Sequence, residues 1–234
     1  MSTSGNNTPH RIVGLLGYKF EYGKKVGFAT SINIGYIGEQ SNPFSYSYNG
    51  DLNGDTINGN DLLYVPIKAT DLKFADLTQT TLGLTTVLYT AAEQQVAFDK
   101  YIDNDPYLST KRGQYVNRNG SILPMLHRLD LGITQDFYIK IAGKKNSFQF
   151  RADILNFTNL LNRNWGVAQR VTNNRILDLA TAPSSANGFE PVFRLPLQTN
   201  RDGSRELIKD RFQYNSDISN VWQAQFTLRY TFGK

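Results

Sequence analysis

The sequence predicts an all-β fold that forms part of an antiparallel transmembrane β-barrel. Three observations lead to this prediction. The 14 Phe and 13 Tyr among the 234 residues gather in runs in which apolar and polar residues alternate. Five of these runs reach the roughly nine to eleven residues that a tilted strand needs to cross a bilayer. Short turns join two pairs of runs, whereas long segments separate the others, as in up-and-down barrels with short turns at one end.

The composition excludes several classes of protein. The chain has no cysteine, which excludes a disulfide scaffold and a cysteine-ligated metal site. Its 25 basic and 20 acidic residues are scattered and leave a net charge of only +5, so no nucleic-acid partner is expected. Residues 1–10 lack the basic start and apolar core of a secretory signal. No segment approaches the ~20 apolar residues of a membrane-spanning helix, but alternating strands cross a bilayer without such a segment.

The last strand, residues 221–232, alternates without a break. Its apolar face carries aromatics near both ends, as expected where a barrel strand meets the two membrane interfaces. The alternative is a strand of a soluble sandwich, although such strands are usually nearer five or six residues long. The apolar face comprises Trp222, Ala224, Phe226, Leu228, Tyr230 and Phe232, and the polar face comprises Gln223, Gln225, Thr227, Arg229 and Thr231.

A first hairpin is predicted from residues 11–22 and 26–38, with its turn at residues 23–25. This turn predicts that Phe20 lies opposite Phe28 and that Leu16 lies opposite Ile32. The other face then carries Ala29, Ser31 and Asn33.

A second hairpin is predicted from residues 126–140 and 147–157, with its turn at residues 141–146. This turn places Phe137 opposite Phe150 and Asp136 opposite Arg151, while Gln135 is a polar exception on the apolar face. The polar faces are predicted to line the barrel lumen, where charged groups need water or a partner. These lumen-lining candidates are Arg128, Asp130, Asp136, Arg151, Asp153 and Arg229.

Five strands cannot close an up-and-down barrel, which needs an even number and at least eight. Residues 1–234 are therefore expected to be the C-terminal part of a larger barrel. The two short turns would be periplasmic, and the long segments 39–125 and 158–219 would be extracellular loops. Within the first loop, residues 91–102 have a helical pattern that stops before Asn104-Asp105-Pro106.

The segment from Asp51 to Asp61 suggests a calcium site. Its D-x-N-x-D spacing turns alternate oxygen ligands towards a hard cation. The predicted ligands are Asp51, Asn53, Asp55 and Asp61, with the Ile57 carbonyl as a fifth. The alternative is a surface turn rich in Asn, Gly and Asp.

Other polar and aromatic residues of the first loop could contact a ligand. The candidates are Tyr107, Arg112, Tyr115 and Arg118, and the alternative is that they pack the loop onto its neighbours. No catalytic or phosphate-binding motif accompanies the two histidines, His10 and His127. The protein is therefore not expected to be an enzyme.

Several motifs, in their order and spacing, resemble the C-terminal barrel region of TonB-dependent outer-membrane receptors, most closely the Oar-like type with a regulatory-like N-terminal domain. The resemblance extends from about Phe44 to the end of the chain. It rests on residues 44–48, 50–55, 60–66, 105–113, 118–120, 128–131, 151–157, 160–166 and 222–232.

The resemblance implies a 22-stranded barrel in the bacterial outer membrane that imports a ligand, is plugged by an N-terminal domain and is driven by an energy-transducing TonB partner. The missing N-terminal strands, the plug and outer-membrane lipid would then be further partners. The last strand also resembles the signal read by the barrel-assembly machinery, at Gln225, Tyr230 and Phe232. The alternative function is that of a soluble calcium-binding β-domain for adhesion or glycan binding at the cell surface, acting through residues 39–125.

Overall fold

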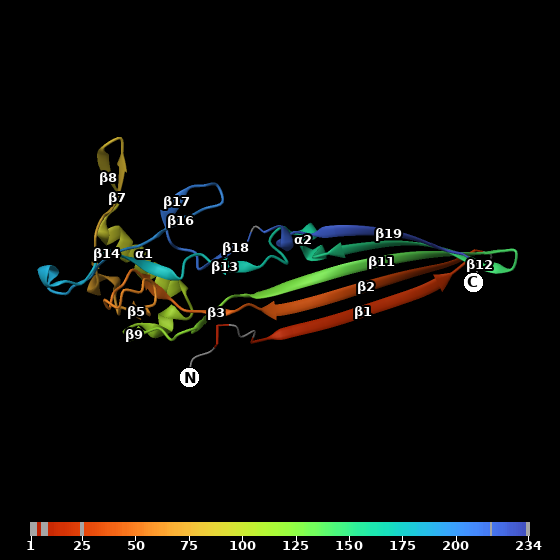
Figure 1. Ribbon diagram of the computed structural model, residues 1–234, viewed down its shortest axis with the longest axis horizontal. Helices are drawn as coiled ribbons and strands as arrows, with labels where there is room; N and C mark the ends of the chain where they lie inside the picture. The colour runs from red at the N-terminus through yellow and green to blue at the C-terminus, as the bar shows by residue number, and fades with distance from the viewer. Residues whose placement is uncertain (1–3, 6–8, 24–25, 216, 233–234) are drawn as a thin grey trace. The chain divides into compact units, whose positions relative to one another are not determined.

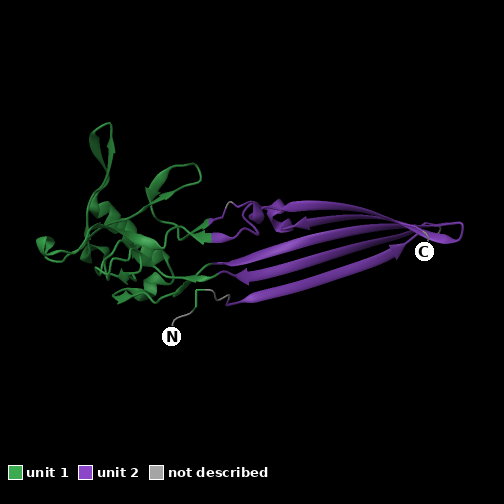
Figure 2. Ribbon diagram, viewed as in Figure 1, with its two compact units in different colours: residues 1–7, 42–123, 170–213 green, residues 8–41, 124–169, 214–234 purple. Residues whose placement is uncertain are grey.

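The computed structural model describes residues 4–5, 9–23, 26–215 and 217–232. The chain is mostly β, as predicted, and its sheets are mainly antiparallel. It divides into two compact units, shown in different colours in Figure 2. Unit 1 comprises residues 1–7, 42–123 and 170–213, and unit 2 comprises residues 8–41, 124–169 and 214–234. In the described part of the chain, no helix has both the length and the apolar character needed to cross a membrane.

Unit 2 is built on one antiparallel sheet with the strand order β1-β2-β11-β12-β19, and its strands lie side by side in Figure 1. All five strands lie where alternation predicted them, with ends shifted by a few residues. Among the described residues, β1 pairs only with β2 and β19 only with β12, so the sheet has two open edges. The elements are β1 (Arg11–Tyr22), β2 (Gly27–Gln40), β11 (Met125–Ile141), β12 (Lys144–Leu155), β19 (Gln223–Thr231) and α2 (Phe157–Leu161).

The register of the first hairpin differs from the predicted one by two residues. Phe20 lies opposite Thr30, and Leu16 lies opposite Ile34. The predicted turn includes Lys24 and Lys25, which lie outside the described residues. Since side chains alternate with a period of two, a shift of two residues leaves every side chain on its predicted face.

The register of the second hairpin is also corrected by two residues. Phe137 lies opposite Phe148, and Arg151 lies opposite Thr134 and not Asp136. The reason is a tighter turn than predicted: Ala142 and Gly143, with φ angles of 49° and 80°, form a two-residue loop between the paired Ile141 and Lys144. Positive φ at both central residues is the geometry of a type I′ hairpin turn, whose twist matches that of the strands.

Unit 1 shows that the two long segments are not simply loops. Residues 42–123 and 170–213 fold together around one hydrophobic core, in which a four-stranded sheet with the order β4-β14-β15-β6 contributes Ile176, Leu177 and Phe193. The strands are β3 (Pro43–Phe44), β4 (Ser47–Asn49), β5 (Tyr64–Val65), β6 (Lys73–Phe74), β7 (Leu77–Thr81), β8 (Leu84–Tyr89), β9 (Gln114–Tyr115), β10 (Ser121–Ile122), β14 (Arg175–Thr181), β15 (Val192–Arg194), β16 (Leu197–Thr199) and β17 (Arg205–Leu207), while β13 (Gln169–Val171) pairs with β18 (Phe212–Tyr214).

The predicted helix forms as α1, residues Ala91–Asn104. It starts with a capping box, in which Thr90 accepts from the Glu93 backbone and Glu93 accepts from the Thr90 backbone. The hydrogen bond from the Thr90 backbone is the main cause that lowers the pKa of Glu93. Phe98 and Ile102 enter the core, whereas Val96 is 56% exposed. The described residues also form four short 3-10 helices: η1 (Ala69–Asp71), η2 (Leu108–Lys111), η3 (Ser185–Asn187) and η4 (Ile218–Asn220).

A buried ion pair joins the two segments of unit 1. The fully buried Asp105 accepts from Arg211 Nε at 2.7 Å and from the Tyr46 hydroxyl at 2.6 Å, both on Oδ2. Its other carboxylate oxygen accepts from the backbone N–H groups of Tyr107 and Leu108. Because Asp105 and Arg211 come from different segments, this cluster links residues 42–123 to residues 170–213.

Burial raises the pKa of both tyrosine hydroxyls next to this cluster. For Tyr46 the neighbouring Tyr101 and Asp105 add to the effect of burial, and for Tyr101 the pKa rises to about 12. Both hydroxyls are therefore protonated at neutral pH, so Tyr46 is able to donate to Asp105.

We expect Asp105→Asn to destabilise unit 1 by about 3 kcal/mol, because it leaves the Arg211 guanidinium without its counter-charge in a largely buried place. Tyr46→Phe should cost about 1–2 kcal/mol, since it removes one hydrogen bond to a charged acceptor. Amide hydrogen exchange of α1 and β14 in the full chain measures both effects. Asp202→Asn, on an exposed turn, is the control and should change stability by less than about 0.5 kcal/mol. Equal exchange in Asp105→Asn and the control would contradict the structural role of the pair.

Candidate functional site

The apolar face of the unit 2 sheet is the main candidate site. Side chains of all five strands contribute to it, and many are exposed: Leu16 is 68% exposed, Phe226 68% and Leu228 66%. A soluble monomer rarely exposes an apolar patch larger than a few hundred Å². The face comprises Ile12, Leu16, Tyr18, Phe20 and Tyr22 of β1, Phe28, Ile32, Ile34 and Tyr36 of β2, Leu129, Leu131, Ile133, Phe137, Ile139 and Ile141 of β11, Phe148, Phe150, Ala152 and Ile154 of β12, and Ala224, Phe226, Leu228 and Tyr230 of β19.

One row of this face is aromatic on every strand, and we call it the aromatic row. Register pairing joins its members across the whole sheet, and the rings of Phe28 and Phe137 meet edge to face with centroids 5.5 Å apart. Such contacts add to the gain from burying the rings themselves. In order from β1 to β19, the aromatic row is Tyr22, Phe28, Phe137, Phe148 and Tyr230.

Further aromatics lie eight residues from the aromatic row. Tyr36 is eight residues from Phe28 on β2, and Trp222 is eight residues from Tyr230 just before β19 begins. Eight residues span about 26 Å along a strand. With the tilt of about 35–45° that barrel strands have, this rises about 20 Å, and the rings extend the band at both ends. The apolar face therefore has the height and the aromatic borders of a membrane-facing band, which is about 25 Å tall.

Gln135, the polar exception on the apolar face, is hydrogen-bonded within the sheet. Its Oε1 accepts from the Thr30 hydroxyl at 2.6 Å and from the Tyr22 hydroxyl at 3.2 Å. Its Nε2 lies within 3.3 Å of the Ala29 carbonyl and 3.1 Å of the Asp136 carbonyl. The amide therefore has protein partners, which lowers the cost of placing it on an apolar surface.

The lumen-lining candidates lie together on the opposite, polar face. Asp136 accepts from Gln149 Nε2 at 2.8 Å. Arg151 binds the Asp153 carboxylate with both Nε and Nη2, at 2.7 and 2.9 Å. The exposed Arg229 pairs in register with Gln149. The structure thus places these residues on one surface, but it pairs Arg151 with Asp153 of its own strand and not with Asp136.

The remaining two candidates, Arg128 and Asp130, form hydrogen bonds at the end of the sheet nearest α2. Arg128 Nη2 donates to the Ser219 carbonyl, and Asp130 accepts from the backbone N–H of Asn156 at 2.7 Å. Asn156 has a φ of 52° and donates to the Gly166 and Asn220 carbonyls, both at 2.9 Å. No motif in the sequence predicted this role of Asn156. A useful indication is an asparagine between a strand and a helix, because Asn tolerates the left-handed conformation.

The residues of the predicted calcium loop organise their own backbone. Asp51 accepts from the N–H groups of Gly54 and Thr56, both at 2.7 Å, and Asp55 accepts from Ile57 N at 2.8 Å. This last bond, followed by that from Asn60, lowers the pKa of Asp55, so its carboxylate is ionised at neutral pH.

The loop provides oxygens that suit a hard cation, but not all of the predicted ligands are brought together. Asn53 Oδ1 accepts from Asp55 N, whereas Asp61 Oδ2 accepts from Leu52 N. In the part of the chain that the structure describes, no three His, Cys, Asp or Glu residues are grouped so as to hold a metal ion. The calcium site predicted at Asp51, Asn53, Asp55 and Asp61, with the Ile57 carbonyl, stays a prediction, because amide and carbonyl oxygens also serve as calcium ligands.

The four candidate ligand residues of unit 1 differ in their contacts. Arg112 forms ion pairs with Asp99 and Asp103 at 2.8 and 2.7 Å, and the Tyr107 hydroxyl accepts from Asn117 N. These contacts match the packing alternative for both residues. Tyr115 packs edge to face on Tyr64 but stays 64% exposed, and Arg118 is exposed as well.

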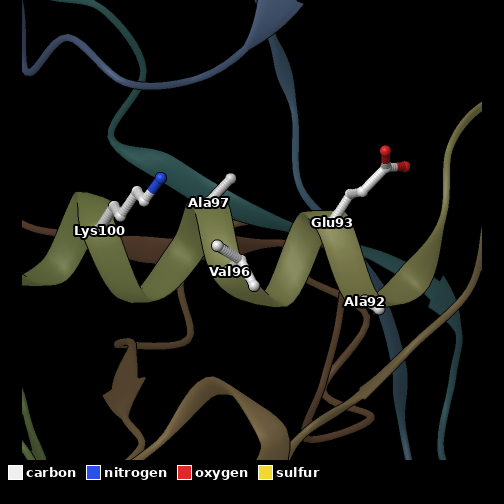
Figure 3. Close-up of a pocket in the computed structure, with 5 residues that line it drawn as sticks. All are labelled: Ala92, Glu93, Val96, Ala97 and Lys100. Atoms are coloured by element: carbon white, nitrogen blue, oxygen red, sulfur yellow. The ribbon is translucent and has the colours of Figure 1, made fainter.

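A shallow surface pocket lies along α1, lined by Ala92, Glu93, Val96, Ala97 and Lys100. Figure 3 shows that all five side chains come from this one helix. The pocket is therefore a feature of the outer face of α1. Since Glu93 is engaged by the Thr90 backbone and hydroxyl, it serves the helix start.

The three residues of the predicted assembly signal lie in or directly after β19. Tyr230 donates to Asn146 Oδ1 at 3.0 Å and stacks on Phe232, which is 75% exposed. Gln225 is exposed on the polar face, opposite Asp153.

Comparison of the chain with protein-family models, curated proteins and solved structures gives no match.

Proposed function

We propose that the chain is the C-terminal part of a TonB-dependent receptor of the bacterial outer membrane. It supplies barrel wall, lumen lining and extracellular surface to a protein that imports a ligand, and it has no catalytic role. The observation that carries this proposal is the apolar face of unit 2, which covers all five strands and is exposed from Phe226 to Tyr230 on β19 and from Leu16 to Tyr22 on β1.

Lipid is the cover that best suits this face. A soluble sheet buries its apolar face against a second layer, but a barrel leaves that face against hydrocarbon and turns its polar face to a wet lumen. The polar face of unit 2 carries the paired groups that such a lumen requires, including Asp136 with Gln149 and Arg151 with Asp153. The two faces together support a membrane wall over a soluble sandwich.

The two open edges support the need for further strands. In an antiparallel sheet of five strands, β1 and β19 run in the same direction, so they are unable to close the sheet by pairing with each other in antiparallel fashion. In a bilayer every edge must be paired. We therefore propose that an odd number of additional strands completes the barrel, which agrees with the 22 strands that the resemblance implies.

The direction of the strands supports an extracellular role for residues 42–123 and 170–213. Both segments leave and rejoin the sheet at its Gln40 and Met125 end, whereas the tight β1–β2 and β11–β12 connections lie at the other end. Barrels of this type have long extracellular and short periplasmic connections. The plug, the energy-transducing TonB partner and the barrel-assembly machinery enter the proposal through the family resemblance.

A second candidate function is calcium binding by a surface β-domain that acts in adhesion or glycan binding. The observation that favours it is the compact core of unit 1 together with the loop that curls around Asp51. Calcium in this loop is compatible with either function, because unit 1 would face the outside of the cell in both.

The membrane proposal predicts different effects for neighbouring residues of β19. Refolded from urea into lipid vesicles together with the missing strands, the wild-type chain should gain β structure and float with the vesicles. Phe226→Arg should weaken this insertion by about 2–4 kcal/mol, because it places a charge against hydrocarbon. The matched control Gln225→Arg lies on the polar face opposite Asp153 and should insert like the wild type. Flotation and far-UV circular dichroism measure both.

A soluble, monodisperse wild-type chain that does not bind vesicles would contradict the membrane proposal and favour the second candidate function, a calcium-binding surface domain. The receptor assignment is tested in cells. Co-expressed with the missing strands and plug, the chain should fractionate with the outer membrane, and its complete recovery in the soluble fraction would contradict that assignment.

Calcium binding predicts a titration by calorimetry, with a dissociation constant of about 10⁻⁵–10⁻³ M. Asp51→Asn should weaken it at least about tenfold, because the variant loses one ligand charge. Asp202→Asn, in another exposed turn, is the control. Binding that is equally strong in Asp51→Asn, or no binding by the wild type, would contradict a calcium site at residues 51–61.

A further inference from the structure

The turn end of the β11–β12 hairpin extends beyond its neighbours in the sheet. The pairing of β11 with β2 ends at Tyr138, and the pairing of β12 with β19 ends at Ser147. Residues 139–146 therefore form a hairpin tip, paired only with itself among the described residues and lying next to the aromatic row.

Three exposed lysines crowd this tip. Lys140 lies directly opposite Lys145 in the register, and Lys144 follows in the next pair, opposite Ile141. Like charges placed opposite each other across two strands destabilise a hairpin. An anion bound between or beside them would remove this repulsion.

No acidic side chain of the described residues forms an ion pair with Lys140, Lys144 or Lys145. At the same end of the sheet, Glu21 is engaged by Lys19 Nζ at 2.7 Å, and Asp136 accepts from Gln149. Lys145 Nζ instead lies 4.1 Å from the centre of the Tyr138 ring. Lys145 also acts electrostatically on the Glu21 carboxylate, so the positive charge of the tip is only partly matched by the described residues.

The tip also continues the apolar face. Ile139 and Ile141 share that face with Phe137 and are 48% and 56% exposed. Lys140 is three residues beyond Phe137, about 10 Å along the strand. If the aromatic row marks the border of the hydrocarbon layer, as the proposed function requires, the lysines lie at the depth of the lipid headgroups, which extend several Å beyond that border.

We propose that the hairpin tip is a binding site for anionic phospholipid headgroups. Lys144, on the apolar face, contacts a phosphate where Ile139 and Ile141 enter the acyl boundary, and Lys140 and Lys145, which the register places on the polar face, add positive charge to the tip. The inference rests on the proposed membrane function and deepens it by naming the lipid class. Juxtamembrane lysines attract anionic lipids in this way. The first hairpin turn repeats the Gly-Lys-Lys sequence of residues 143–145 at residues 23–25, of which Lys24 and Lys25 lie outside the described residues.

The test compares the chain on two kinds of vesicle, one of phosphatidylcholine alone and one that also contains phosphatidylglycerol. At low salt, the wild-type chain should partition more strongly to the anionic vesicles. The variant K140Q/K144Q/K145Q should lose about fivefold of this preference per lysine, or about 100-fold in total. The control K68Q/K100Q/R201Q removes the same charge from exposed positions of unit 1 and should lose far less. Added inorganic phosphate should compete only weakly, since it lacks the acyl chains.

The outcomes separate the two proposals. Equal partition of the wild type to both vesicles would overturn the headgroup site while leaving membrane insertion intact, and so would an equal loss in the control variant. Full competition by inorganic phosphate would show a small-anion site and overturn the lipid assignment. A chain that binds neither vesicle would overturn the membrane function and the headgroup site together.

Discussion

One physical constraint governs unit 2: a five-stranded sheet with one continuous apolar face and two open edges has to be covered and completed by something outside it. Leu16, Phe226 and Leu228 are all about two-thirds exposed, and burial of such side chains is worth about 1.5–3 kcal/mol each. The paired polar face excludes a second apolar layer on that side. Lipid on one face, water on the other and further strands at both edges satisfy the constraint at once.

The alternation of side chains made much of unit 2 predictable from the sequence. The five strands and their two faces follow from a period of two. A register error of two residues at the turn therefore leaves each side chain on its predicted face. Both predicted registers were wrong by two residues. In the second hairpin the reason is the tight Ala142-Gly143 turn, which needs an alanine at positive φ that local propensity does not indicate. Phe137 consequently meets Phe148 rather than Phe150, which aligns the aromatic row across the sheet.

Unit 1 was much less predictable, for a different physical reason. Its core joins residues 42–123 to residues 170–213, and short strands such as β4 and β14 pair in parallel across a large sequence separation. No local sequence pattern predicts a pairing between strands so far apart in the chain. Asp105 and Arg211 are 106 residues apart, so their buried ion pair is visible only once the fold is known. The loop around Asp51, by contrast, follows from local Asx turns, which its sequence does indicate.

The most direct test of the central claim measures which face of β19 meets lipid. Since the chain has no cysteine, single cysteines at positions 224 to 230 allow a spin label at each site after refolding in vesicles with the missing strands. We predict that accessibility to oxygen dissolved in the bilayer peaks at Ala224, Phe226, Leu228 and Tyr230, whereas accessibility to a water-soluble nickel complex peaks at the residues between them. Uniform exposure to the nickel complex along the strand, with no alternation, would contradict the membrane account.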